Sequence, residues 1–485
     1  MLVIPGKTGT LCDGPTRREL LRAGSIGLFG LSLPNFLQWQ KAQAAPAASA
    51  SRLEGSRGFG AAKSVIMVFL QGGPSHLDIF DPKPNAPSNI RGEFKAISTK
   101  VPGIQLGEHM PMFADQVKRY TLIRSMSYTP SGLFNHTAAI YQMLTGYPPD
   151  KVSPSGQLEP PSPADFPTAG SHISKMMPPK EPVLPFVEMP RPLQESSVIG
   201  KGGAAGFLGK AYDPYRLYQD PNKAIRLDDL TLRKEVSPER LKDRLELLKG
   251  INGSMPQLEK ALKDQAIDEY YAKAFDLVLS GKARDAFDLN KEEDKARDRY
   301  GRTTFGQSLL MARRLIEAGT RFVQVNWPAV ANGNPEVDAF DTHAANFGPL
   351  KNLHCPVLDR GLSALVEDMD QRGMLKDTLV VAVGEFGRSP RMGVSTSGNT
   401  NSPDGRDHWP YCYTAMITGA GIPGGKLYGE SDATGSSPKE KPVHPNDLLA
   451  TVYYSLGINP DMEVLNHLNQ PRELVKGKPL ADLWV

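Results

Sequence analysis

Continuous apolar segments along the chain predict a parallel β-sheet. Residues 64–70 form such a segment and end at Gly72, Gly73 and Pro74, as expected for a strand that is buried on both faces and followed by a turn. Segments of the same kind recur, each about as long as one strand. They span residues 120–125, 321–326, 378–383 and 411–418, with a shorter one at 186–189.

Segments with helical periodicity alternate with these strands. Residues 305–318 carry apolar side chains at helical spacing, then Gly319 and a strand, and residues 359–372 repeat the pattern before Gly373. A last helix is predicted at 445–456. Helices followed by strands indicate an α/β protein with a mostly parallel central sheet flanked by helices.

Two regions interrupt this alternation. Residues 150–192 are rich in Pro and Ser and predict a long surface segment. Residues 233–249 are densely charged, with Leu241, Leu245 and Leu248 on one helical face, and predict an amphipathic helical insertion that extends to about residue 300. Its charged face is either simply solvated or a surface for assembly with other subunits, so the oligomeric state stays open.

The N-terminus has the pattern of an export signal. Arg17 and Arg18 precede an apolar stretch at 24–37, which is shorter than the roughly 20 residues of a membrane-spanning helix. A small-residue cleavage pattern follows at 42–44. The segment resembles a bacterial twin-arginine signal, although Leu20 stands where that motif more often has Phe.

The predicted organisation follows from this pattern. It comprises an export signal at 1–44, a linker rich in Ala, Ser, Pro and Gly at 45–62, and one α/β domain at 63–485. We expect location in the periplasm or cell envelope without a transmembrane anchor. An amphipathic first helix is the alternative interpretation of residues 1–44.

Composition restricts the chemistry. The 56 basic and 53 acidic residues give a net charge of only +3, which argues against nucleic acid as a partner. Three cysteines cannot form a disulfide framework or a Cys-only zinc site. A metal would therefore have to be held by histidines and carboxylates.

Candidate metal ligands stand next to the ends of the predicted strands, where α/β proteins place their functional groups. They are His76, Asp78, Asp341, His343, Glu385 and His408. Imidazole and carboxylate groups suit one or two divalent ions such as zinc, manganese or calcium. Taken singly, each is more often a turn or capping residue, and only their grouping favours a metal centre.

Three further residues are candidates for catalysis. Arg388 follows Glu385 closely and either grips an anionic oxygen or fixes the loop through a salt bridge. His136 and Thr137 open a short helix that ends at Gly146. The start of a helix is a suitable place for a nucleophile, and the alternative is an ordinary capped helix without a catalytic role.

Five motifs in order carry a family resemblance. They are GGPSHLD at 72–78, HTAxxYQMLTG at 136–146, DTH at 341–343, EFGRSP at 385–390 and GRDHW at 405–409. Together they resemble a bacterial family of exported proteins that is known as a domain of unknown function and is grouped with the alkaline phosphatase and sulfatase superfamily. The resemblance runs from about Lys63 to the C-terminus.

The resemblance implies a metal-dependent hydrolase of phosphate or sulfate esters, with a small molecule or a glycan as substrate. It implies Asp341, His343 and His408 as ligands of one metal and Glu385 as an acidic ligand of another.

The chain also departs from the superfamily pattern. His136 stands at the position of the usual Cys or Ser nucleophile, Phe386 replaces an imidazole ligand, and Gln71-Gly72 stand where an Asp ligand is usual, with Asp78 or His76 as possible substitutes. Two alternatives follow. Either one metal is bound with His136 as ligand or nucleophile, or the protein has lost hydrolysis and binds anionic glycans or protein partners in the same cleft.

Overall fold

The computed structural model describes residues 53–149, 161–195, 198–231, 277–328 and 339–485, with a few positions between 237 and 247. The predicted export signal, residues 45–52 of the predicted linker, and residues 233–236 and 248–276 of the predicted insertion lie outside the described residues and stay predictions.

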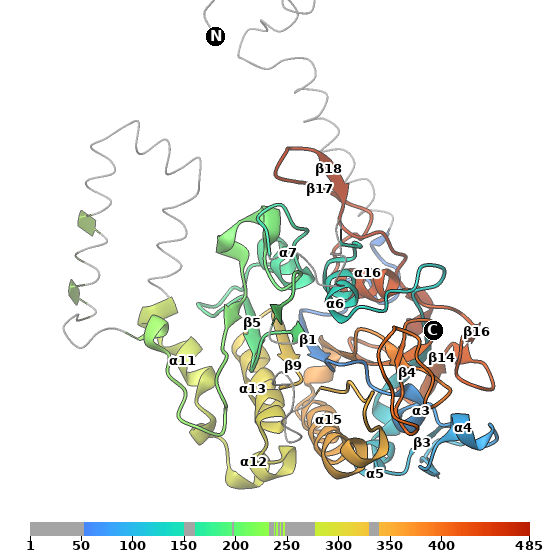
Figure 1. Ribbon diagram of the computed structural model, residues 1–485. Coiled ribbons are helices and arrows are strands. Elements are labelled where there is room, and N and C mark those ends of the chain that lie inside the picture. Colours follow the sequence, from blue (N-terminus) through green and yellow to red (C-terminus); the bar gives the residue numbers. More distant parts are fainter. Residues whose placement is uncertain are drawn as a thin grey trace, which may run out of the picture.

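One mixed sheet forms the centre of the described chain (Figure 1). It has eight strands in the order β14-β4-β13-β10-β1-β9-β5-β8. Their bounds are β1 Ser64–Phe69, β4 Thr121–Met126, β5 Phe186–Met189, β8 Tyr215–Arg216, β9 Phe322–Asn326, β10 Thr378–Val383, β13 Tyr413–Gly419 and β14 Lys426–Tyr428. Most neighbouring pairs are parallel, which confirms the predicted α/β class and the six predicted strands.

Strand β13 runs against its neighbours. It pairs antiparallel with β10 and with β4, so its first residues lie beside the carboxyl ends of both strands. Loops that precede β13 and loops that follow β1, β4, β9 and β10 therefore meet at one edge of the sheet.

Helices cover both faces of the sheet (Figure 1). The longer ones are α6 His136–Thr145, α7 Ala169–Met176, α13 Thr304–Ala318, α15 Cys355–Gln371 and α16 Pro445–Ser455. The shorter ones are α3 His76–Ile79, α4 Ser88–Arg91, α5 Pro111–Asp115, α11 Lys282–Phe287, α12 Asp294–Tyr300 and α14 Phe347–Pro349, with a π-helical segment at Leu350–His354. The three predicted long helices are thereby confirmed within a few residues.

Short two-stranded ribbons decorate the loops. They pair β2 Ala96–Ser98 with β3 Gln105–Gly107, β6 Gln194–Glu195 with β7 Val198–Ile199, β11 Gly387–Arg388 with β12 His408–Trp409, β15 Glu430–Ser431 with β16 Pro438–Glu440, and β17 Glu463–Leu465 with β18 Pro471–Glu473.

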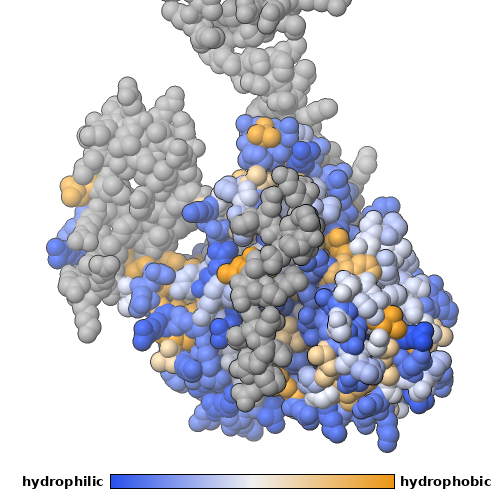
Figure 2. All heavy atoms as spheres, viewed as in Figure 1, coloured by the Kyte–Doolittle hydropathy of each residue, from blue (hydrophilic) through white to orange (hydrophobic). Residues whose placement is uncertain are grey.

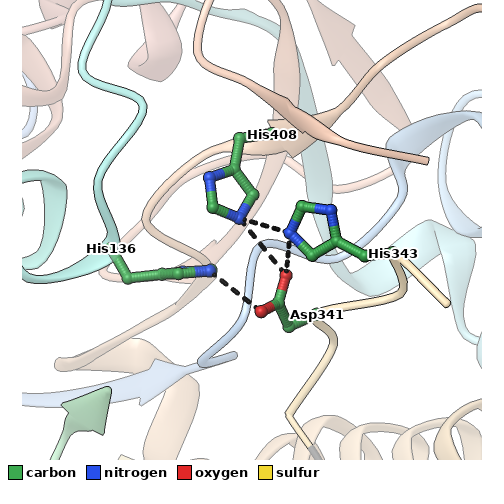
Figure 3. Close-up of side chains that lie close together, drawn as sticks. All are labelled: His136, Asp341, His343 and His408. Atoms are coloured by element: carbon green, nitrogen blue, oxygen red, sulfur yellow. Dashed lines mark hydrogen bonds and ion pairs between the residues drawn. The ribbon is translucent and has the colours of Figure 1, made fainter. Parts of the chain in front are cut away.

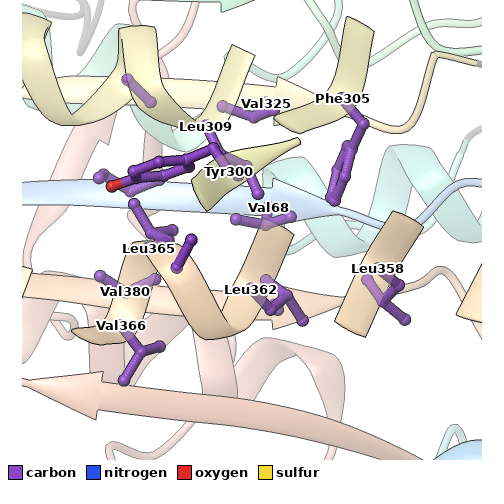
Figure 4. Packing of buried hydrophobic residues seen from close by; sticks show 14 of the residues in the cluster. Val68, Tyr300, Phe305, Leu309, Val325, Leu358, Leu362, Leu365, Val366 and Val380 are labelled. Atoms are coloured by element: carbon purple, nitrogen blue, oxygen red, sulfur yellow. The ribbon is translucent and has the colours of Figure 1, made fainter. Parts of the chain in front are cut away.

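The hydrophobic core has two halves because successive side chains of a buried strand point to opposite faces. Ile66 and Val68 of β1 pack toward α13 and α15, and Figure 4 shows Val68 among residues of these helices, including Leu309 and Leu362. Met67 packs in the other half, with residues of α6, α7 and α16. Burial on both faces explains why β1 is continuously apolar.

The described end of the predicted insertion belongs to this core. Phe287 of α11 and Tyr300 of α12 are buried in the half that contains α13 and α15. Cys355 and Cys412 are buried free thiols.

The face seen in Figure 2 is largely hydrophilic, with scattered hydrophobic side chains. Within the described ranges, none of the helices combines the length and the hydropathy that a membrane crossing requires.

Candidate metal centre

Four side chains from three parts of the chain converge at the edge of the sheet where the loops after β1, β4, β9 and β10 meet the loop before β13 (Figure 3). His136 is the first residue of α6, Asp341 and His343 lie in the loop after β9, and His408 opens β12. One ligand atom from each lies within 4.8 Å of the other three.

Local hydrogen bonds hold these positions. The Asn135 side chain caps α6 by accepting from the Ala138 amide at 2.9 Å, which fixes the start of the helix at His136. The Phe340 amide donates to the Gln71 carbonyl at the end of β1, 3.0 Å away. In the β11–β12 ribbon Arg388 stands opposite His408. Each ligand thus comes from backbone that is tied to the sheet edge.

The Asp341 carboxylate is the centre of the group. Its Oδ1 lies 2.9 Å from His343 Nε2 and 3.3 Å from His408 Nε2, and its Oδ2 lies 3.3 Å from His136 Nε2. The Nε2 atoms of His343 and His408 are only 2.8 Å apart. All three imidazoles therefore direct Nε2 to the same place (Figure 3).

The other ring nitrogen of each histidine faces an acceptor. His136 Nδ1 lies 2.6 Å from Glu385 Oε1 and His408 Nδ1 lies 2.5 Å from the Phe134 carbonyl. His343 Nδ1 lies 2.8 Å from Asn401 Oδ1 and 3.3 Å from Asp407 Oδ1. A neutral imidazole that donates through Nδ1 has its lone pair on Nε2.

This arrangement fits a divalent cation. Two Nε2 lone pairs that face each other at 2.8 Å repel unless a proton or a cation lies between them. Among the described residues, the buried His136 Nε2 contacts no acceptor other than Asp341 Oδ2, 3.3 Å away. Three imidazoles and one carboxylate form the donor set that zinc and related transition ions prefer.

Electrostatics reflect the crowding of these groups. Burial acts to lower the pKa of His136, but the carboxylates of Asp341 and Glu385 raise it to about 10. Burial and the neighbouring His136 lower the pKa of His408 to about 3. Burial acts to raise the pKa of Asp341, yet Arg388 and His136 hold it well below its usual value.

Glu385 and Arg388 lie directly behind the ligands. Glu385 is fully buried, accepts from the Gly72 amide at 2.8 Å and faces His136 Nδ1. Arg388 is also fully buried and donates to Asp341 Oδ1 at 2.6 Å and to the Gly73 and Arg406 carbonyls at 2.9 and 3.2 Å. Glu385, which the family resemblance implies as a ligand of a second metal, lies outside the four-residue group and directs Oε1 to His136 Nδ1.

Three other candidates lie outside the four-residue group because they have different partners. Asp78 binds the buried Arg406 guanidinium at 2.8 Å. His76 Nε2 faces the Gly435 carbonyl at 2.8 Å. Thr137 Oγ1 donates to Asn135 Oδ1 at 2.7 Å. The structure places Asp78 and His76 in contacts that stabilise loops and places Thr137 in the helix cap.

Sequence reasoning missed the residues that orient the ligands. Asp407 and Asn401 face His343, and only Asp407 stands next to a recognised candidate in the sequence. Phe386, at the position of an imidazole in the superfamily pattern, packs its ring 4.8 Å from that of His136 and 4.7 Å from that of His408.

The fold and site together define the class: an α/β protein with a candidate three-histidine, one-aspartate metal centre at the carboxyl edge of its sheet. A family model described as "Protein of unknown function (DUF1501)" matches residues 62–484. The chain belongs to this family, as its motifs predict. Among curated proteins, none matches the chain.

Several solved structures are similar in fold. A sulfatase from Pseudoalteromonas sp. shares 12% identity at a TM-score of 0.35, with 86% of this chain and 72% of that chain covered. A phosphonate monoester hydrolase from Silicibacter pomeroyi shares 11% at 0.36, covering 86% and 76%. A protein in the alkaline phosphatase superfamily from Vibrio parahaemolyticus shares 12% at 0.36, covering 86% and 75%.

Proposed function

We propose that this protein is an exported, metal-dependent hydrolase that acts on a phosphate or sulfate ester of a small molecule or a glycan. The observation that carries the proposal is the convergence of three Nε2 atoms on the Asp341 carboxylate. The ester class follows from the family resemblance of the motifs, and export follows from the twin-arginine pattern of residues 1–44.

The donor set favours a single zinc or manganese ion. Calcium prefers oxygen ligands only, and three of the four donors here are imidazoles. Glu385, the residue expected at a second metal, directs its Oε1 to His136 Nδ1. A bound divalent ion would act as a Lewis acid on an ester oxygen.

The chain's own residues would keep this site ready for substrate. Glu385 and Asp407 fix the ring orientations of His136 and His343, and Arg388 holds Asp341 Oδ1. The Asp341 side chain is 39% exposed whereas that of Arg388 is fully buried, so substrate would approach from the Asp341 side. Preorganised ligands of this kind need little rearrangement when charge develops in the transition state.

A binding role without hydrolysis is the second candidate, and particular contacts favour it. His136 takes part in the ligand group, Thr137 donates its hydroxyl to Asn135, and Arg388 donates to carbonyls as well as to Asp341. The expected nucleophiles and the expected anion-binding group are thus already engaged. Such a protein would hold an anionic glycan or a protein partner at its metal.

Metal analysis of natively purified protein is the first test. We expect about one equivalent of zinc or manganese in the wild type and a large loss in His408→Ala, with an unchanged circular dichroism spectrum. Absence of bound metal from the wild type would contradict both candidate functions.

Turnover separates the two candidates. The hydrolase predicts release of product from aryl phosphate or aryl sulfate esters, and nearly complete loss of turnover in His408→Ala. A metal-loaded wild type that hydrolyses neither class of ester would instead favour the binding role.

A further inference from the structure

A cavity of about 440 Å³ lies at the same edge of the sheet as the metal centre. Its walls include Glu188 near the carboxyl end of β5 and Arg216 at the end of β8. Strands β5, β8 and β9 are parallel, so their ends face the edge where Asp341 lies. The volume falls in the range of about 300–1,000 Å³ that is typical of small-molecule sites.

Helix α6 connects the cavity to the metal centre. Ile140 and Leu144 line the cavity, and they follow His136 by four and eight residues. Residues at this spacing lie on one face of a helix, so the face that begins with the ligand His136 continues along the cavity. The Gln71 side chain, beside Gly72, also donates to the Gln194 carbonyl, next to the lining residue Leu193.

Most of the lining is apolar. Besides residues of α6, it contains Pro161, Pro192, Leu193 and Ile199. Ile199 is 53% exposed, which is unusual for a large hydrophobic side chain in a protein whose visible face is mostly hydrophilic (Figure 2). An apolar wall of this kind gains free energy when it is covered by an apolar group.

Four of the five charged side chains in the lining already have partners. Glu188 accepts from Tyr218 at 2.9 Å and from Asn326 at 3.0 Å. Lys201 pairs with Asp165 at 3.1 Å, and Arg216 donates to the Gly203 carbonyl at 2.8 Å. Asp213 accepts from the Ala205 amide at 2.7 Å, and Lys210 is exposed. A charged ligand would have to break these pairs, whereas an uncharged apolar group leaves them intact.

We propose that this cavity binds the apolar alcohol portion of the ester, while the phosphate or sulfate group lies at the metal. This inference rests on the proposed hydrolase function and adds its substrate class: esters of aryl or bulky alkyl alcohols. The short distance along α6, the apolar walls and the paired charges all support that occupant.

A glycine in the wall allows the cavity to be filled without straining the backbone. A Cβ atom at Gly203 would meet only Glu188 Oε1, at 3.9 Å. Gly203→Leu therefore places a side chain in the cavity. Gly348→Leu is the matched control, because a Cβ atom there meets nothing within 4 Å.

Binding of 2-naphthol, an uncharged and fluorescent alcohol, tests the cavity without requiring turnover. We expect saturable binding to the zinc-loaded wild type and to the Gly348→Leu control. Binding to Gly203→Leu should be at least tenfold weaker, with equal zinc content in all three proteins. Ile199→Asp changes an exposed side chain of the same wall and should also weaken binding, so it serves as the test if Gly203→Leu does not fold. Absence of binding to the wild type, or equal binding to the cavity variants, would overturn the inference.

Hydrolysis is measured separately. 2-Naphthyl phosphate and sulfate should show a lower KM than their methyl counterparts in the wild type, and Gly203→Leu should remove that advantage. If naphthol binds as expected but no ester is hydrolysed, the proposed hydrolysis is overturned and the apolar site stands.

Discussion

The two ring nitrogens of each histidine in the site have different partners. In His136, His343 and His408, Nδ1 faces an oxygen acceptor and Nε2 faces Asp341. Sequence reasoning can select these residue types, but it cannot determine which nitrogen faces inward. That depends on acceptors such as the Phe134 carbonyl, which no motif reveals.

Glu385→Gln tests the orienting role of Glu385. The substitution removes the negative charge beside His136 Nδ1 but keeps the size of the side chain. Loss of such a partner typically lowers metal affinity by roughly 10- to 100-fold. We expect a decrease of that order in isothermal titration with zinc. The exposed Glu463→Gln serves as control, and equal affinity in both variants would contradict the role.

His172 in α7 should make stability depend on pH. It is buried, and burial together with Lys175 lowers its pKa from 6.5 to about 3. The unfolded chain therefore binds a proton near pH 6.5 that the folded protein does not bind. The stabilisation is complete above pH 6.5 and is lost as pH falls toward 3, by about 1.4 kcal/mol per pH unit.

His172→Gln has no such group to protonate. Urea unfolding between pH 7 and pH 4 should show a smaller loss of free energy of unfolding in this variant than in the wild type. The exposed His467→Gln should keep the wild-type slope. Identical slopes in all three proteins would show that His172 is not responsible.

At the scale of elements, strands and helices were predictable but the direction of one strand was not. The predicted strands at 378–383 and 186–189 match β10 and β5, because fully buried strands are continuously apolar. The segment 411–418 predicts β13 as a strand, yet nothing in its composition distinguishes parallel from antiparallel pairing. Because β13 is antiparallel to its neighbours, His408, which precedes β13 in the chain, reaches the same edge of the sheet as Asp341.

The loop after β1 and the loop of Asp341 come unusually close at Gly72. Its φ is +104°, and a Cβ atom there would lie 2.4 Å from the Phe340 amide nitrogen and 2.8 Å from that of Asp341. Gly72→Ala should therefore displace Asp341 and weaken zinc binding by at least tenfold, in addition to lowering stability by about 1–3 kcal/mol through backbone strain.

Gly55→Ala separates these two effects. Gly55 has a similar φ of +85°, but a Cβ atom there meets nothing within 4 Å. It should lower stability without changing zinc affinity. Zinc titration and thermal unfolding of both variants check this, and unchanged zinc affinity in Gly72→Ala would contradict the close-approach argument.

At the scale of the whole molecule, the site depends on contacts between distant parts of the sequence. Asp78 and Arg406, which are 328 positions apart, form a buried ion pair, and Arg406 also contacts the Ser389 carbonyl. A short-range pattern shows that Asp78 is polar and near a strand end, which makes it a candidate ligand. Only the folded chain shows that a buried arginine occupies its carboxylate.

Because the ligands come from segments around residues 136, 341 and 408, a bound metal links distant parts of the molecule. A ligand that binds only the folded state stabilises it by about 2.7 kcal/mol at a concentration 100 times its Kd. Zinc at such a concentration should therefore raise the Tm of the metal-stripped protein by several degrees, as differential scanning calorimetry would show.

His343→Ala removes one ligand and should abolish most of this rise in Tm. Calcium should raise the Tm only slightly even in the wild type, because the donors are mainly imidazole nitrogens. A chelator should reverse the effect of zinc. An equal rise in Tm with zinc in wild type and His343→Ala would place the metal elsewhere, and an equal rise with calcium would point to an oxygen-only site instead of the three-histidine centre.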